Sequence, residues 1–162
     1  MSLAKEIEGR IARYSDRRED WTVFGFETNS DPRYARSQRR YIGASGSIDH
    51  EEQNAVKPVA FTMSIQTMPG GNRIPVHRHE TEETFFILSG SCTVNIYRDG
   101  ETVTVKLNSW DLISVPAMVY HDIYNEGAED CAVQTLLSKP TPNRPDYRDP
   151  ELLELQAKTY TR

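Results

Sequence analysis

Three histidines and one glutamate are the residues of this chain best suited to chemistry. His77, His79 and Glu83 lie close together, and His121 follows further along the chain. Side chains alternate between the two faces of a strand, so the even spacing of the first three places them on one face. Imidazole nitrogens and a carboxylate oxygen are ligands for a divalent transition metal such as Fe, Mn, Ni or Zn. The pattern predicts a metal site, and the alternative is a metal-free core in which the histidines only form hydrogen bonds.

Other polar residues are weaker candidates. Gln66, Arg73 and Tyr120 could reach the mouth of the site or lie on the surface, where the fourth histidine, His50, is also expected. A group of four arginines could bind a carboxylate or phosphate through bidentate guanidinium contacts, and a solvated face or a subunit contact is the simpler interpretation. The group consists of Arg33, Arg36, Arg39 and Arg40.

Strands are the elements that must position these residues. Short alternating apolar segments recur along the chain with turn residues between them, which is typical of an all-β barrel or sandwich. The Asp99-Gly100 pair predicts a tight hairpin. Strands are expected over residues 21–26, 59–68, 84–88, 92–98, 102–107, 111–115, 121–125 and 131–137.

The same alternation predicts which apolar side chains face the barrel interior. We expect these residues to form the core, and an apolar substrate pocket is the alternative. The predicted inward residues are Phe61, Met63, Ile65, Phe85, Ile87 and Ile123.

Both ends of the chain differ from the strand-rich middle. A short helix is expected over residues 4–16, where Ile7, Ile11 and Tyr14 form a stripe that docks on the barrel or on a second subunit. Residues 29–57 are polar and are interpreted as irregular. A proline-rich connector leads to a closing helix, with Pro150 in its first turn. The predicted divisions are residues 1–57 for the N-terminal helix and arm, 58–138 for the barrel, and 139–162 for the connector and C-terminal helix.

Composition narrows the class of protein. The 162 residues suffice for one domain, and a formal net charge of −5 disfavours binding to nucleic acid or to an anionic membrane. Cys92 and Cys131, the only cysteines, are expected to be free thiols in a reducing cytosol, and a single disulfide is the alternative. The sequence has no signal-like or membrane-spanning apolar run, so we expect a cytoplasmic protein.

The segments that hold the four candidate ligands resemble the two motifs of the cupin family. Residues 71–90, GNRIPVHRHETEETFFILSG, match the pattern Gly-x5-His-x-His-x3,4-Glu-x6-Gly at every fixed position. The second pattern, Gly-x5-Pro-x-Gly-x2-His-x3-Asn, is matched at Pro116, His121 and Asn125. Trp110 and Met118 stand where the family has glycine. Because Trp and Met do not readily adopt positive φ, the loop conformation is expected to change at these two positions.

The resemblance covers about residues 58–138 and implies the fold and the site. The implied fold is all-β, a double-stranded β-helix or cupin jelly-roll barrel, with short flanking N- and C-terminal helices. Asn125 and Asp111 are candidates for partners that orient the ligands. The implied ligands of one divalent metal are His77, His79, Glu83 and His121.

The resemblance also implies a class of function. Four protein ligands on a six-coordinate ion leave two positions open, which suits a dioxygenase-type oxidoreductase acting on a small aromatic or enolisable substrate. A Mn- or Zn-type decarboxylase or isomerase is one alternative, and a cupin that binds a small ligand without catalysis is another. Small cupins are commonly homodimers, so a homodimer is expected. No general acid or base is assigned.

Overall fold

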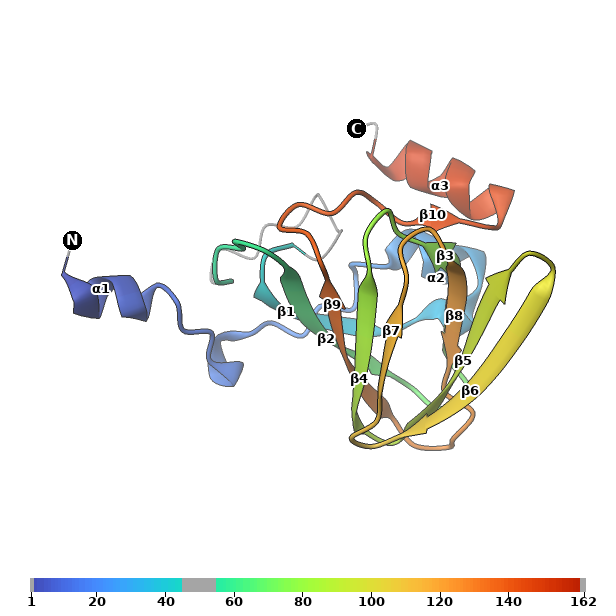
Figure 1. Ribbon diagram of the computed structural model, residues 1–162, viewed down its shortest axis with the longest axis horizontal. Coiled ribbons are helices and arrows are strands. Elements are labelled where there is room, and N and C mark those ends of the chain that lie inside the picture. The colour runs from blue at the N-terminus through green and yellow to red at the C-terminus, as the bar shows by residue number, and fades with distance from the viewer. Residues whose placement is uncertain (1, 45–54, 161–162) are drawn as a thin grey trace.

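Two antiparallel five-stranded sheets face each other in the computed structural model, which describes residues 2–44 and 55–160 (Figure 1). The strand orders are β1-β2-β9-β4-β7 and β10-β3-β8-β5-β6. Pairs remote in sequence, such as β2 with β9, are the crossovers of a jelly roll, so the predicted all-β jelly-roll barrel is confirmed. The strands are β1 Ser37–Ile42, β2 Thr62–Met68, β3 Arg73–Arg78, β4 Glu83–Ser89, β5 Ser91–Arg98, β6 Glu101–Asn108, β7 Leu112–Val115, β8 Tyr120–Tyr124, β9 Cys131–Leu137 and β10 Asp146–Tyr147.

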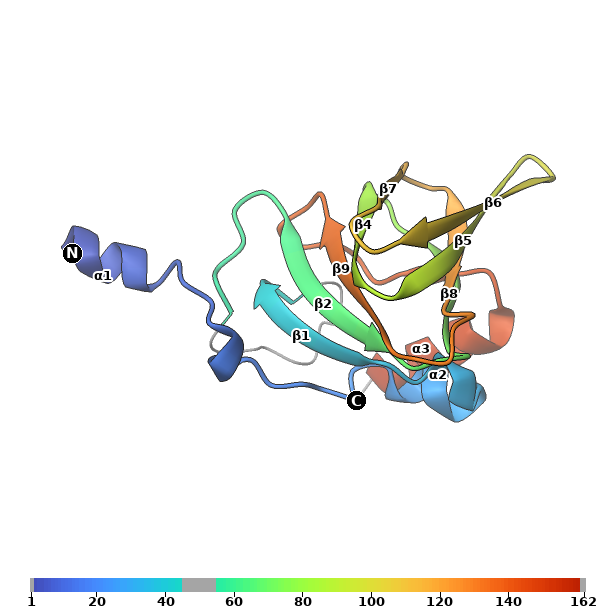
Figure 2. The same cartoon turned by 90° about the horizontal axis from the view of Figure 1, so that it is seen from below.

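Short helices flank the two sheets. The helix α1 lies away from the sheets (Figures 1 and 2), and none of its residues is buried. The helices α2 and α3 pack together through Phe26 and Leu152, with Tyr147 between them. None of the described helices is long and apolar enough to cross a membrane. The helices are α1 Leu3–Glu8, α2 Gly25–Ser30 and α3 Pro150–Tyr160, with single 3-10 turns at Tyr14–Asp16 and Pro32–Tyr34.

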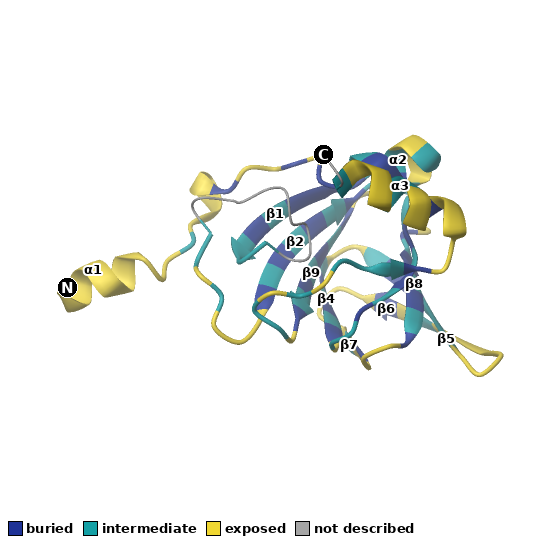
Figure 3. Cartoon of the chain, turned by 90° about the horizontal axis from the view of Figure 1, so that it is seen from above, coloured by how far each residue is buried: buried dark blue, intermediate teal, exposed yellow. Residues whose placement is uncertain are grey.

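The main core lies between the two sheets, where Figure 3 shows buried residues following the strands. Phe85, Ile87 and Ile123 are fully buried in it, so these predicted inward residues form core packing and do not line a substrate pocket. Cys92 and Cys131 also lie in this core, and both are free thiols.

The inward face of β2 is polar, which contradicts the prediction for this strand. Ser64 and Gln66 are buried, whereas Met63 and Ile65 are only half-buried and Phe61 precedes the strand with 36% of its surface exposed. The inward residues predicted on this strand are therefore wrong by one position. A shift of one residue moves every side chain of a strand to the other face. The physical reason is that Gln66 lines a cavity and Ser64 accepts a hydrogen bond from Gln38, so Met63 and Ile65 face the other side of the sheet.

Three further predictions are wrong in the N-terminal region. The helix expected over residues 4–16 ends at Glu8, and a separate 3-10 turn covers Tyr14–Asp16. The apolar run 21–26 is not a strand, because Asp20 accepts hydrogen bonds from the Thr22 backbone N–H and hydroxyl at 2.9 and 2.6 Å, and α2 begins at Gly25. Within the polar segment 29–57, β1 pairs with β2 along its length. Its buried polar side chains are held by hydrogen bonds, which a search for apolar alternation does not detect.

Candidate metal centre

The four candidate ligands come from both sheets. His77 on β3 pairs in register with His121 on β8, so their side chains lie next to each other in one sheet. His79 follows the end of β3, and Glu83 is the first residue of β4 in the other sheet. All four side chains are buried. The segment from His79 to Glu83 passes from one sheet to the other, so candidate ligands from both sheets face one point. The fourth histidine, His50, lies outside the described residues.

Three imidazole nitrogens converge on one carboxylate oxygen. The Nε2 atoms of His77, His79 and His121 lie 3.4, 3.5 and 3.0 Å from Oε2 of Glu83. Ligand atoms of His77, His79 and Glu83 all lie within 4.8 Å of one another. The structure thus brings together all four side chains that the sequence predicted.

Backbone carbonyl groups orient two of the rings. Nδ1 of His77 lies 2.8 Å from the Pro75 carbonyl oxygen, and Nδ1 of His121 lies 3.0 Å from that of Val119. A carbonyl oxygen only accepts, so Nδ1 of each ring donates in this contact, and Nε2 is the nitrogen that faces Glu83. Nδ1 of His79 is buried without a hydrogen-bond partner among the described residues. This arrangement is typical of histidines that ligate a metal through Nε2.

The charge of the donor set suits a divalent cation. Burial raises the pKa of Glu83, but the three histidines hold that pKa well below its usual value, so the carboxylate is ionised. Burial lowers the pKa of His79 to about 4, against the opposing charge of Glu83. Burial also lowers the pKa of His121, but its hydrogen bond to Glu83 raises it above the usual value. A buried carboxylate facing three imidazole nitrogens has the donors, and the need for positive charge, that a transition-metal ion satisfies.

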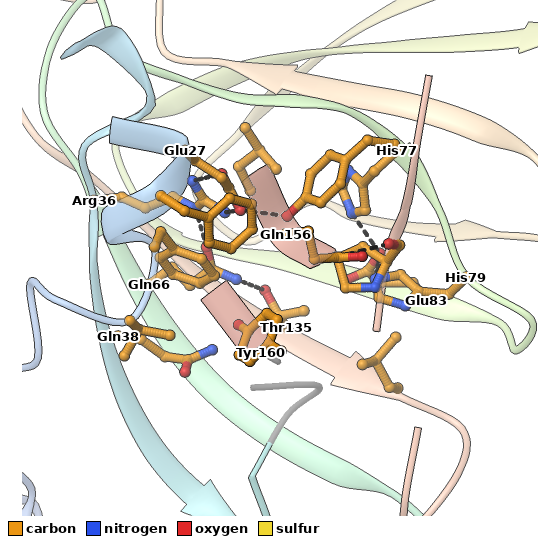
Figure 4. A pocket seen from close by; sticks show the side chains of 17 residues that line it. Glu27, Arg36, Gln38, Gln66, His77, His79, Glu83, Thr135, Gln156 and Tyr160 are labelled. Atoms are coloured by element: carbon orange, nitrogen blue, oxygen red, sulfur yellow. Dashed lines mark hydrogen bonds and ion pairs between the residues drawn. The ribbon is translucent and has the colours of Figure 1, made fainter. Parts of the chain in front are cut away.

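A small cavity of about 50 Å³ lies beside three of the four side chains, His77, His79 and Glu83 (Figure 4). His77, His79 and Glu83 form one wall, and residues of β1, β2 and β9 form the wall opposite. Tyr147, residues of α2 and α3, and several apolar side chains from neighbouring segments complete the lining. The opposite wall is formed by Arg36, Gln38, Gln66 and Thr135.

Arg36 is the centre of a buried network that the sequence did not reveal. Its Nη1 lies 2.7 Å from Oε2 of Glu27, and its Nε donates to Oε1 of Gln66 at 2.8 Å. The Tyr147 hydroxyl donates to Oε1 of Glu27 at 2.5 Å. Both charged groups are less than 4% exposed. The one available signal was the local density of arginines, which does not identify the member that is buried.

The arginine group does not form a single clamp. Arg33 pairs with Asp31, Arg39 pairs with Glu19, and Arg36 pairs with Glu27. Arg33 lies in the 3-10 turn Pro32–Tyr34, Arg36 just before β1 and Arg39 on β1, so the three side chains reach different partners. The geometry therefore does not support a carboxylate- or phosphate-binding clamp, and the solvated face preferred over it does not describe Arg36 and Arg40, which are buried.

Three polar candidates have different outcomes. Gln66 was expected either at the mouth of the site or on the surface, and it lines the cavity. Arg73 lies outside this lining and pairs with Asp31 at 3.4 Å. Tyr120 also lies outside it, with its hydroxyl 3.3 Å from Asp146.

Neither predicted orienting partner contacts a ligand. Asn125 donates to the carbonyl oxygens of Met68 and Glu129 at 2.9 and 2.8 Å, so it supports the turn after β8. Asp111 accepts from the backbone N–H of Asn108 in the turn before β7. The predicted roles are wrong because backbone carbonyls orient the rings of His77 and His121.

The loop before β8 holds His79 through its backbone. The N–H of Met118 donates to the His79 carbonyl oxygen at 2.8 Å, and the φ of Met118 is 63°. Trp110, the other residue that stands at a motif glycine, has a φ of 76°. The expected change in loop conformation is wrong, because both residues keep left-handed backbone. That backbone costs a non-glycine residue about 1–2 kcal/mol.

Known proteins share this domain. The cupin domain model matches residues 64–137. Auxin-binding protein 1 of Arabidopsis thaliana is 29% identical over 112 residues, which are 66% of this chain and 54% of that protein. Gentisate 1,2-dioxygenase of Haloferax sp is 31% identical over 88 residues, which are 54% of this chain and 24% of that protein.

Solved structures agree on the fold. Oxalate decarboxylase of Bacillus subtilis, in a study of its Mn(II) centres, superposes with a TM-score of 0.57 at 16% identity, over 70% of this chain and 28% of that one. At this identity the likeness shows the fold alone. The chain spans 48% to 64% of the length of the first curated relatives it matches. The two sheets, the two motifs and the family match together show that residues 64–137 of this chain form a cupin domain.

Proposed function

We propose that this protein is a metal-dependent oxidoreductase of the dioxygenase type that acts on a small enolisable substrate. The observation that carries the proposal is the convergence of three Nε2 atoms on the Glu83 carboxylate, beside a cavity. A divalent metal held by His77, His79, Glu83 and His121 would supply Lewis acidity toward a substrate oxygen and, where the metal is iron, electrons for O₂. The 31% identity to gentisate 1,2-dioxygenase over 88 residues supports oxidation by O₂.

The side chains of the cavity set the size of the substrate. A volume of about 50 Å³ is well below the roughly 150 Å³ of a cavity that binds benzene. The proposed substrate is therefore a small enolisable compound and not an aromatic one. Tyr147, Leu137 and Pro145 also line the cavity, so part of its wall is apolar.

Oxygen consumption tests this proposal. Iron-loaded protein is mixed with 1,3-diketones and short oxo acids in one series, and with catechol and gentisate in another, and O₂ is followed with an electrode. We expect uptake with members of the first series and none with the second. A His77→Ala, His79→Ala variant should consume no O₂ above background. The absence of uptake with every compound of the first series would contradict the proposal.

Two alternatives have their own support. Metal-dependent decarboxylation is favoured by the small size of the cavity, which suits a short acid, and it would release carbon dioxide without consuming O₂. Ligand binding without turnover is favoured by the relationship to auxin-binding protein 1. It would give saturable binding of a small acid with neither O₂ uptake nor product.

A further inference from the structure

The wall of the cavity that faces the four candidate ligands carries two glutamines. Gln38 on β1 and Gln66 on β2 are direct partners in register, and their side chains are buried, with 2% and 7% of the surface exposed. Both residues line the same cavity as His77 and Glu83. A substrate in this cavity would lie between the ligand cluster and the two amides.

Two arginines fix which end of each amide faces the cavity. A primary amide has one oxygen that accepts and one NH₂ that donates. Nε of Arg36 donates to Oε1 of Gln66 at 2.8 Å, and Nε of Arg40 donates to Oε1 of Gln38 at 3.1 Å. Since each arginine holds a carbonyl oxygen, each NH₂ group is turned the other way.

The contacts of the two NH₂ groups agree with this orientation. Nε2 of Gln66 donates to the Thr135 hydroxyl at 3.2 Å, and Nε2 of Gln38 donates to the Ser64 hydroxyl at 3.2 Å. In Figure 4 both amide nitrogens lie on the side that faces the histidines. Each hydroxyl takes one of two N–H groups, so one N–H of each glutamine remains to donate to a ligand. This wall therefore presents hydrogen-bond donors.

A cavity with a cation at one wall and N–H donors at the other is complementary to a molecule with oxygen at both ends. A water molecule needs roughly 10–15 Å³ of such volume, so 50 Å³ admits only a short molecule. We propose that the substrate is an acid of roughly two to four carbons that carries a carboxylate at one end and a second carboxylate or oxo group at the other. One end lies at the ligand cluster, and the other accepts hydrogen bonds from Gln38 and Gln66. This inference rests on the proposed function and specifies its substrate class.

Binding of short acids to zinc-loaded protein tests the inference without oxidation, because zinc has no redox chemistry. Oxalate, malonate and succinate are compared with acetate by isothermal titration calorimetry. We expect one of the dicarboxylates to bind at least about tenfold more tightly than acetate, because a second charged group gains hydrogen bonds. Gln66→Glu, which replaces the donor by a carboxylate of the same shape, should weaken that dicarboxylate about 10- to 100-fold. It should leave acetate binding and zinc content within about twofold of wild type.

Two further variants make the outcome decisive. Gln134→Glu, the same change on an outward-facing position of β9, should alter neither affinity. Gln38→Glu replaces Gln66→Glu if the latter does not fold, with the same expectation. Dicarboxylates that bind no better than acetate, or a glutamate variant that weakens both ligands equally, would overturn the inference. A third outcome separates the two proposals. If the protein retains zinc and prefers a dicarboxylate, but its iron form takes up no O₂, the proposed oxidation is overturned and the substrate class is not.

Discussion

At the scale of single residues, the partners that surround each buried polar group determine its charge state and allow its burial. Glu83 is ionised in the core because three imidazoles face it, and Glu27 is buried because Arg36 and Tyr147 contact it. Asp20 follows the same rule outside the cavity. Burial raises its pKa, but hydrogen bonds from Thr22 and the ion pair with Arg18 lower that pKa to about 2. These residues are fixed by contacts that composition and periodicity do not describe.

Asp20→Asn should make the stability of the protein less dependent on acid pH. A carboxyl whose folded pKa is depressed stabilises the fold above its unfolded pKa of 3.8, and that contribution is lost as pH falls through about 2. We expect the variant to lose about 1–2 kcal/mol of unfolding free energy at pH 7, with the difference shrinking between pH 4 and pH 2. Urea denaturation at several pH values measures this. Asp16→Asn, at an exposed position, is the control, and an Asp20 effect of equal size at pH 7 and at pH 2 would refute the argument.

At the scale of elements, loops with left-handed residues hold the strands that carry the site. Asp99 and Gly100 have φ values of 52° and 83°, so the predicted hairpin between β5 and β6 is confirmed. Trp110 and Met118 adopt the same backbone region without the freedom of glycine. Met118 is the more consequential of the two, because its N–H holds the carbonyl group of His79.

Met118→Val should destabilise the protein, because a β-branched side chain is poorly compatible with positive φ. We expect a loss of about 1–3 kcal/mol of unfolding free energy in metal-free protein. Met118→Gly, the matched variant, relieves the strain and should stay within about 1 kcal/mol of wild type. Denaturant unfolding distinguishes the two. A valine variant as stable as the glycine variant would show that the backbone at this position is not constrained.

Much of this fold could be predicted from the sequence. Alternation located most strands from β4 to β9, and the spacing of His77, His79 and Glu83 identified the site, because both depend on local geometry. The strand β1 and the facing of β2 could not be predicted in this way, since their inward residues are polar and satisfied by partners remote in sequence. The polar cavity wall, with Arg36 and Glu27, was missed for the same reason.

At the scale of the whole molecule, apolar surface remains exposed on the N-terminal arm. On α1 and the segment after it, Leu3, Ile7 and Ile11 are 72%, 48% and 44% exposed. The helix lies away from its own sheets in both views (Figures 1 and 2). Because exposed apolar patches in soluble proteins mark interaction surfaces, we propose that this arm packs on a second copy of the chain.

The proposed homodimer has a direct test in solution. Sedimentation equilibrium should give about twice the chain mass of 18.5 kDa. A Leu3→Asp, Ile7→Asp variant should shift the protein to the mass of one chain, because charged side chains oppose burial of the helix. Lys5→Ser on the same helix serves as a control and should leave the mass unchanged. A single-chain mass for wild type at every concentration would contradict the dimer.

The central claim of this account is that His77, His79, Glu83 and His121 hold one divalent metal, and elemental analysis of protein purified without added metal tests it most directly. We predict about one transition-metal ion per chain in wild type and in His50→Ala, which removes the histidine outside both motifs. His77→Ala combined with His79→Ala should retain less than about a tenth of that metal while keeping the β-sheet circular dichroism spectrum. Wild-type protein without metal, or a double variant with an unchanged metal content, would contradict the claim.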